Sequence, residues 1–142
     1  MKRLALWLSC IVATWSAAAH ADTLRSFAVS GLFRDNSVMS GTLTVDEDTG
    51  TITACDIKVS GPETVTFQSV IKQATVGMAA VVVLAPAHEE WPRLVFGERT
   101  FPGSLRRYRG GPLGRRTDIV QSDHSKQLIL SGHLIAISAQ SS

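Results

Sequence analysis

A two-residue alternation of apolar and polar side chains runs through much of the chain and limits its fold more than any other feature. Residues 27–33 place Phe27, Val29 and Phe33 on one face, and residues 39–45 and 53–59 repeat the pattern. This period is that of a β-strand with one buried face. No stretch combines a helical period with capping residues. The sequence therefore predicts an all-β fold, a single antiparallel β-sandwich or up-and-down barrel of about seven or eight strands.

Later segments extend the same reading. Val65, Phe67 and Val70 predict one further strand, and residues 93–98 and 127–138 predict two more. The unbroken apolar run of residues 76–85 is too short to cross a membrane, and its β-branched centre favours a strand buried on both faces. Its alanines leave a short helix as the alternative. Residues 101–116, rich in glycine, proline and arginine, predict a loop.

An acidic cluster at residues 46–50, Asp46-Glu47-Asp48-Thr49-Gly50, separates two of these strands. It is similar to the start of a calcium loop, but positions five and twelve counted from Asp46 hold Gly50 and Ile57. Such a loop needs an oxygen ligand at the first of these and a glutamate at the second. The spacing therefore favours a hairpin turn over a cation site, since Gly50 tolerates the positive φ that such turns use.

The amino terminus predicts export. Lys2 and Arg3 precede an apolar run that ends in small residues at Ala19-His20-Ala21. This is the pattern of a secretory signal peptide, so we expect cleavage after Ala21 and a β domain over residues 22–142 in the periplasm or outside the cell. The sequence disfavours lipidation at Cys10, because Trp7 stands where such signals carry leucine.

Cysteine and charge add two constraints. After cleavage Cys55 has no partner for an intramolecular disulfide, and its phase in the alternation predicts burial as a small apolar residue. Basic and acidic residues then balance, but unevenly, with 5 Lys or Arg against 10 Asp or Glu in residues 22–98 and 7 against 2 in residues 99–142. This asymmetry indicates either a surface for a charged partner or a match between neighbouring strands.

Residues 27–61, "FAVSGLFRDNSVMSGTLTVDEDTGTITACDIKVSG", resemble the opening of uncharacterised exported β proteins of proteobacteria and cyanobacteria. In these proteins Phe-x-x-Ser-Gly-x-Phe leads through Ser-Gly-Thr to Asp-x-x-Thr-Gly, and many carry a Pro-Glu-Pro sorting tail that this chain lacks. The resemblance covers about 35 residues, and its motif consists mainly of residues typical of turns and strands. It implies an extracytoplasmic β domain and no particular activity.

The arginine-rich segment is the most distinctive candidate for binding. Guanidinium groups hold phosphate and carboxylate in two-pronged fashion, and a tyrosine among them can stack on a sugar. For an exported chain this favours an anionic glycan, a glycolipid or an acidic protein surface over nucleic acid. The alternative is a solvated loop whose arginines pair with the chain's own carboxylates. The predicted contact residues are Arg106, Arg107, Tyr108, Arg109, Arg115 and Arg116.

Catalytic chemistry has less support. His88, Asp123, His124 and His133 are the available metal ligands, but nothing in the sequence sets them side by side. No Gly-x-Ser-x-Gly nucleophile elbow is present. We therefore expect no cofactor, no metal and no catalytic residue, and predict a non-enzymatic domain with a binding or structural role at the cell envelope. A small metal-dependent hydrolase is the alternative.

Overall fold

The structure is a computed structural model, and it describes residues 23–137. The predicted signal peptide, residues 1–21 with Cys10, lies outside the described residues. The described part contains ten strands and one short 3-10 helix, and none of its helices is long and apolar enough to cross a membrane. In chain order the elements are β1 (Leu24–Phe33), β2 (Val38–Asp46), β3 (Thr51–Ser60), β4 (Val65–Phe67), β5 (Ser69–Val76), β6 (Ala79–Ala85), β7 (Arg93–Phe101), η1 (Leu105–Arg107), β8 (Gly110–Pro112), β9 (Asp118–Val120) and β10 (Lys126–Ala136).

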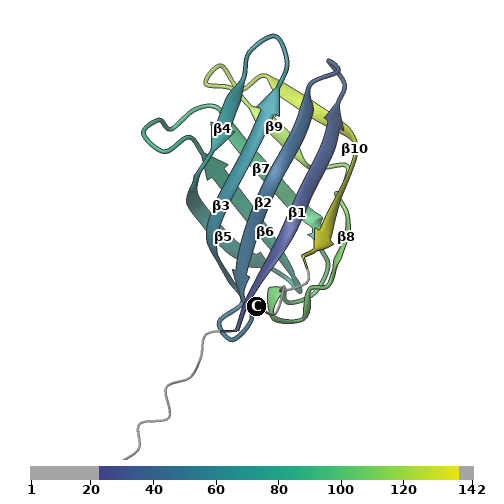
Figure 1. Cartoon of the computed structure of the whole chain (residues 1–142). Coiled ribbons are helices and arrows are strands. Elements are labelled where there is room, and N and C mark those ends of the chain that lie inside the picture. Colours follow the sequence, from purple (N-terminus) through teal and green to yellow (C-terminus); the bar gives the residue numbers. More distant parts are fainter. Residues whose placement is uncertain (1–22, 138–142) are drawn as a thin grey trace, which may run out of the picture.

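All strand pairs are antiparallel, and the sheet curls until it is nearly closed into a barrel (Figure 1). Its strand order is β4-β3-β2-β1-β10-β9-β7-β6-β5, with β8 added beside β10. The two ends of this order, β4 and β5, are separated along the chain only by Gln68. One continuous segment therefore pairs first with β3 and then with β6, which brings the sheet round on itself. The predicted all-β antiparallel fold is confirmed, in its barrel form.

A side chain joins the sheet edges where the backbone ladder is missing. Between β3 and β5, next to the β2–β3 turn, the Gln73 carboxamide accepts a hydrogen bond from Ile52 N at 2.9 Å and donates one to Gly50 O at 2.7 Å. The amide group thus takes the place of a backbone peptide of a neighbouring strand. Two edge groups are satisfied that would otherwise need water.

The inward positions of the alternation form the core. Phe27, Val29 and Phe33 of β1 are buried, as the sequence predicts, and so are Met39, Leu43 and Val45 of β2. Five phenylalanines at 27, 33, 67, 96 and 101 are fully enclosed and fill much of the interior. Since each large apolar side chain contributes about 1.5–3 kcal/mol when fully buried, this filling is the main stabilising term of the fold.

The third strand confirms the prediction for Cys55, which is buried between Leu43 and Ile57 on the core side. Thr53 departs from the predicted phase and is exposed, while Ile52 points inward. The cause is a shift in register opposite Thr44 and Val45, where β3 carries one extra residue. A β-bulge of this kind reverses the alternation locally.

Three sequence predictions need correction. The one strand predicted from Val65, Phe67 and Val70 is two strands, β4 and β5, which are divided at Gln68. The apolar run of residues 76–85 is not one strand buried on both faces, because a turn at Gly77-Met78 divides it and leaves Met78 85% exposed. In β6 the burial alternates, with Ala80, Val82 and Leu84 facing the core. Residues 101–116 are not all loop, since they include the end of β7, the helical turn η1 and strand β8.

The connections gather at the two ends of the barrel. At the end we call the hairpin end lie the β2–β3 turn, the β5–β6 turn and η1 (Figure 1). At the opposite end, which we call the loop end, lie residues 34–37, 61–64, 86–92 and 121–125. The arginine-rich segment begins at the hairpin end and continues along the side of the barrel through β8 to β9.

Candidate functional site

The acidic residues 46–50 form the turn of the β2–β3 hairpin. Asp46 Oδ1 accepts hydrogen bonds from the backbone N–H groups of Asp48 at 2.8 Å and Thr49 at 3.2 Å, and Gly50 has φ of +70°. Hydrogen bonds from Thr49, followed by the one from Asp48, hold the pKa of the Asp46 carboxyl below its ordinary value of 3.8. The carboxylate is thus engaged by its own turn, as an Asx turn requires, which confirms the predicted hairpin.

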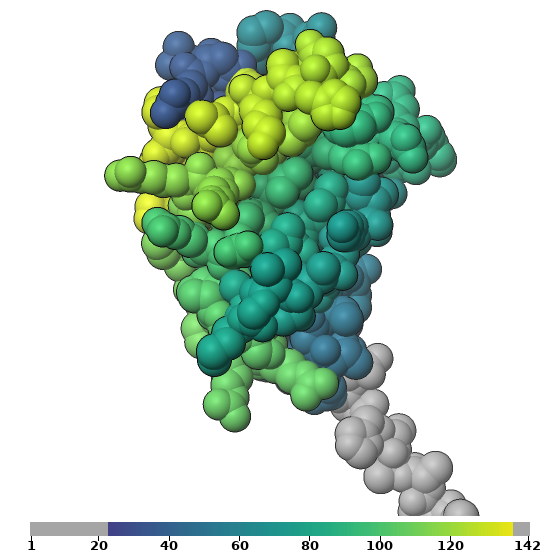
Figure 2. All heavy atoms as spheres, turned by 180° about the vertical axis from the view of Figure 1, so that it is seen from behind, coloured from purple at the N-terminus to yellow at the C-terminus, as the bar shows by residue number. Residues whose placement is uncertain are grey.

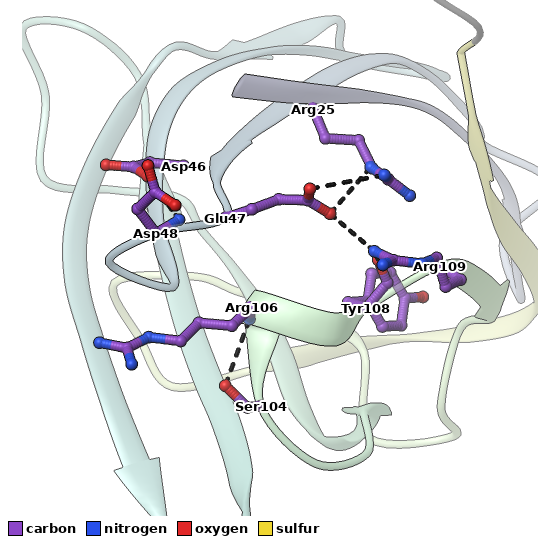
Figure 3. A network of polar contacts seen from close by, with 8 residues as sticks. All are labelled: Arg25, Asp46, Glu47, Asp48, Ser104, Arg106, Tyr108 and Arg109. Atoms are coloured by element: carbon purple, nitrogen blue, oxygen red, sulfur yellow. Dashed lines mark hydrogen bonds and ion pairs between the residues drawn. The ribbon is translucent and has the colours of Figure 1, made fainter. Parts of the chain in front are cut away.

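The arginine-rich segment packs against this turn. Ser104 Oγ accepts from Arg106 N at 3.2 Å and begins η1, which presents Arg106 toward the hairpin (Figure 3). The stem of Arg106 covers Gly50, where an added Cβ would come within 3.0 Å of Arg106 Cγ. Gly50 is therefore needed both for its positive φ and for this close approach.

Glu47 connects two arginines at the hairpin end. Its carboxylate lies 2.9 Å from Arg25 Nε and 2.6 Å from Arg109 Nη1 (Figure 3). The Glu47 side chain is only 14% exposed, whereas that of Arg109 is 61% exposed. One predicted contact residue thus pairs with the acidic part of the same chain. Arg25 was not a sequence candidate, whereas Glu47 belongs to the acidic cluster, and this pair agrees with the alternative that the arginines pair with the chain's own carboxylates.

Tyr108 is a core residue. Its ring packs against Phe27 and Phe101 with centroids 5.3 and 5.2 Å apart, and the residue is 6% exposed. Among the described residues no group forms a hydrogen bond with its buried hydroxyl. Burial raises its pKa to about 12. The ring is therefore enclosed between two phenylalanines, where stacking on an external sugar would require it to leave the core.

Arg115 and Arg116 occupy a different place, on the side of the barrel. They are the two central residues of a turn that is closed by a hydrogen bond from Thr117 N to Gly114 O at 2.9 Å. Both are exposed. The two arginines therefore occupy consecutive exposed positions of one turn.

This turn is fixed to β7 by a buried pair of threonines. Thr100 Oγ1 accepts from Gly114 N at 3.2 Å and lies 3.0 Å from Thr117 Oγ1. Gly97 allows the close contact, because an added Cβ would lie 2.6 Å from Arg116 Cβ. The backbone that carries the arginine pair is therefore held in one position, although the arginines themselves are exposed.

The arginine pair borders a groove of about 480 Å³ on the outer face of the barrel. Figure 2 shows the side of the molecule that carries β5, β6 and β7. Its apolar part is formed by Val81, Val95 and Leu128 from three strands. Lys126 adds a third cation from β10, and its Nζ lies 3.7 Å from Asp118 Oδ2. Burial raises the pKa of Asp118, and Lys126 opposes that rise. The remaining charged lining residue is Glu98.

Lys126 and Asp118 are functional candidates that the sequence did not indicate. They stand eight positions apart and come together only because β9 and β10 pair, with Lys126 opposite Val120 and Leu128 opposite Asp118. The sequence showed the two arginines but not their third cationic neighbour. Only a prediction that β9 and β10 pair as a hairpin could have placed Lys126 beside Asp118.

The histidines that the structure describes are not gathered into a metal site. Among residues 23–137 no group of three or more His, Cys, Asp or Glu side chains is arranged to hold a metal ion. His124 lies beside Trp91, with ring centroids 6.2 Å apart, while His133 faces outward in the middle of β10. Cys55 is buried, and its pKa is raised to about 11 by burial and, to a smaller extent, by Asp56. The four candidate ligands, His88, Asp123, His124 and His133, therefore form no cluster of this kind within residues 23–137.

Comparisons with protein-family models, curated proteins and solved structures gave no match, so function is inferred from the residues of this chain alone. The resemblance of residues 27–61 to exported β proteins stays a prediction.

Proposed function

We propose that this chain is an extracytoplasmic, non-enzymatic binding domain that holds an anionic group of an envelope glycolipid or glycan beside Arg115 and Arg116. The observation that carries the proposal is the clamped turn, in which two adjacent arginines project over a groove from a backbone fixed by Thr100 and Thr117. A fixed backbone lowers the entropy lost when the side chains engage a ligand.

The chemistry of the groove fits an anion with an apolar neighbour. Guanidinium groups bind phosphate and carboxylate through paired N–H donors, and Lys126 adds a further cation. Val81, Val95 and Leu128 offer an apolar surface to the rest of the ligand. Asp118 is already next to Lys126, so the arginine pair is the strongest positive feature of the groove.

The other predicted arginines, Arg106, Arg107 and Arg109, do not line this groove. Arg109 pairs with Glu47, and the stem of Arg106 lies over Gly50 next to the acidic turn. Tyr108 is enclosed in the core. Of the predicted contact residues, Arg115 and Arg116 thus combine exposure, a fixed backbone and an adjacent groove.

The test is a titration of the protein with octyl phosphate below its micelle concentration, followed by NMR shifts of backbone amides. Shifts centred on residues 114–118 and 126–128 are expected. Replacing both arginines, Arg115→Gln with Arg116→Gln, is expected to weaken binding about tenfold or more, since two charge-assisted contacts are lost.

The matched control removes the same charge elsewhere, through Arg106→Gln with Arg107→Gln, and is expected to leave binding unchanged. Neutral octyl glucoside and inorganic phosphate serve as ligand controls for the two halves of the ligand. Equal weakening by both double variants, or shifts centred away from the groove, would refute the proposal.

A further inference from the structure

A second cavity, of about 220 Å³, opens at the loop end of the barrel. Residues from the β1–β2 turn, the β3–β4 loop, the β6–β7 loop and both strands of the β9–β10 hairpin line it. It lies at the end opposite η1 and the acidic turn, apart from the groove of the proposed function. The mouth of a β-barrel is a common place for a small-molecule site.

A chain of hydrogen bonds sets the polarity of this cavity. Gln127 Nε2 donates to Ser37 Oγ at 3.2 Å, and Ser37 Oγ donates to Asp35 Oδ2 at 2.7 Å. Asp35 Oδ1 also accepts from Ser37 N at 2.9 Å. Because every donor in the chain points toward Asp35, the Gln127 carbonyl oxygen is left at the other end as an acceptor. Ser37 is only 3% exposed, so the central group of this hydrogen-bond chain is buried.

The lining combines an apolar base with a rim of acceptors. Val59 and Ile119 are buried at the base, and Val65 is half-buried beside them. Glu63 adds a second carboxylate to Asp35. The hydrogen bonds from Ser37 lower the pKa of Asp35, which keeps that carboxylate ionised at neutral pH. None of the described residues that line the cavity is a lysine, arginine or histidine.

Such a lining selects for charge and for shape. A ligand that brings N–H donors and a positive charge satisfies acceptors that no side chain of the cavity neutralises, whereas an anion meets two carboxylates. Apolar cavities of about 150 Å³ take up benzene, so the space suits a six-carbon body together with one ammonium group.

We infer that the loop-end cavity is a binding site for a small amphipathic cation, an ammonium group on a short hydrocarbon body. The hydrocarbon packs on Val59, Val65 and Ile119. The ammonium donates to Asp35, Glu63 and the Gln127 carbonyl.

The inference is tested by titrating the whole protein with hexylammonium chloride and following backbone amide shifts by NMR. Saturable shifts at residues 35–37, 63–65 and 119–127 are expected. Hexanol and hexanoate are the matched probes, because they keep the hydrocarbon and remove or reverse the charge. Both are expected to bind at least about tenfold more weakly than the amine.

Two double variants, one at the cavity and one away from it, separate a loss of binding groups from a general loss of folding or charge. Asp35→Asn with Glu63→Gln removes both carboxylates while an asparagine can still form the Asx turn, and it is expected to lower the affinity for hexylammonium about tenfold. Asp48→Asn with Glu98→Gln removes the same charge away from the cavity and is expected to retain full affinity. Equal binding of hexanol and hexylammonium, no saturable shifts at the loop end, or equal loss in both double variants would each overturn the inference.

Discussion

Glu47 and Arg109 stand 62 positions apart in the chain, yet the Glu47 carboxylate lies 2.6 Å from Arg109 Nη1. The same carboxylate lies 2.9 Å from Arg25 Nε, so it joins the start of β1, the hairpin turn and the residues between η1 and β8. This contact ties three segments together at the hairpin end. It also neutralises part of the positive charge of the arginine-rich segment.

Replacing Glu47 by glutamine is expected to destabilise the protein by about 1 kcal/mol, because two arginines lose a half-buried partner. In a double-mutant cycle with Arg109→Gln, the coupling energy should be about 0.5 kcal/mol and should decrease at high salt. Urea unfolding measures both quantities. Glu89→Gln, at an exposed glutamate of the loop end, is the control, and a loss of the same size there would contradict the assigned role of Glu47.

Tyr108→Phe is expected to leave stability unchanged or to raise it by about 1 kcal/mol, since the variant removes a buried hydroxyl that has no partner among the described residues. Tyr108→Ala should cost about 3–5 kcal/mol, because a core aromatic side chain is lost. Thermal unfolding checks both. A clear loss of stability in the phenylalanine variant would show that the hydroxyl makes a stabilising contact.

Tyr108 is also the one tyrosine of the chain, so its ionisation can be followed by ultraviolet absorbance. The pKa in the folded protein is about 12, raised by burial from an ordinary value of 10.0. Because the folded state binds this proton more tightly than the unfolded state, stability is retained below pH 10.0 and decreases as the pH rises toward 12. Titration of the folded protein near pH 10 would contradict the burial of the ring.

The two threonines that hold the Arg115-Arg116 turn are expected to differ in their effect. Thr100→Val removes the acceptor of Gly114 N and the partner of Thr117, and should cost about 2 kcal/mol. Thr117→Val leaves the bond between Gly114 and Thr100 intact and should cost about 1 kcal/mol. Chemical unfolding measures the difference, and the reverse order would show that Thr117 has the larger part in the clamp.

The thiol of Cys55 is expected to be unreactive in the folded protein. Burial raises its pKa to about 11, so little thiolate is present at neutral pH, and only the thiolate reacts readily with disulfide reagents. A chain comprising residues 22–142 should react with Ellman's reagent only after denaturant is added. Rapid reaction under native conditions would place the thiol at the surface.

Asp46 predicts a dependence of stability on acid. Its pKa is lowered in the folded protein, so its contribution is present above the ordinary value of 3.8 and is lost as the pH falls through the folded value. The wild-type protein should therefore melt at a higher temperature than Asp46→Asn at pH 7, and the difference should shrink below pH 3.8. A difference that is constant with pH would show that the charge of Asp46 has no part in the turn.

The sequence by itself determined the β class, the inward faces of β1 and β2 and the hairpin at residues 46–50. These features depend on order along the chain, since alternation defines a buried face and the Asp46 carboxylate bonds backbone groups two and three residues later. Where local signals conflicted, sequence reasoning was less accurate. The Gly77-Met78 turn was hidden within an apolar run, and the bulge at Thr53 reversed an otherwise regular phase.

Only the tertiary structure decided between barrel and sandwich, and it alone separated the arginines into different environments. Closure depends on the segment around Gln68 leaving β3 for β6, and the neighbours of each arginine depend on that closure. Arg109 meets Glu47, whereas Arg115 and Arg116 border a groove with Lys126. Such contacts join residues distant in the chain, and their energies depend on distance and burial, which a one-dimensional pattern of charges does not contain.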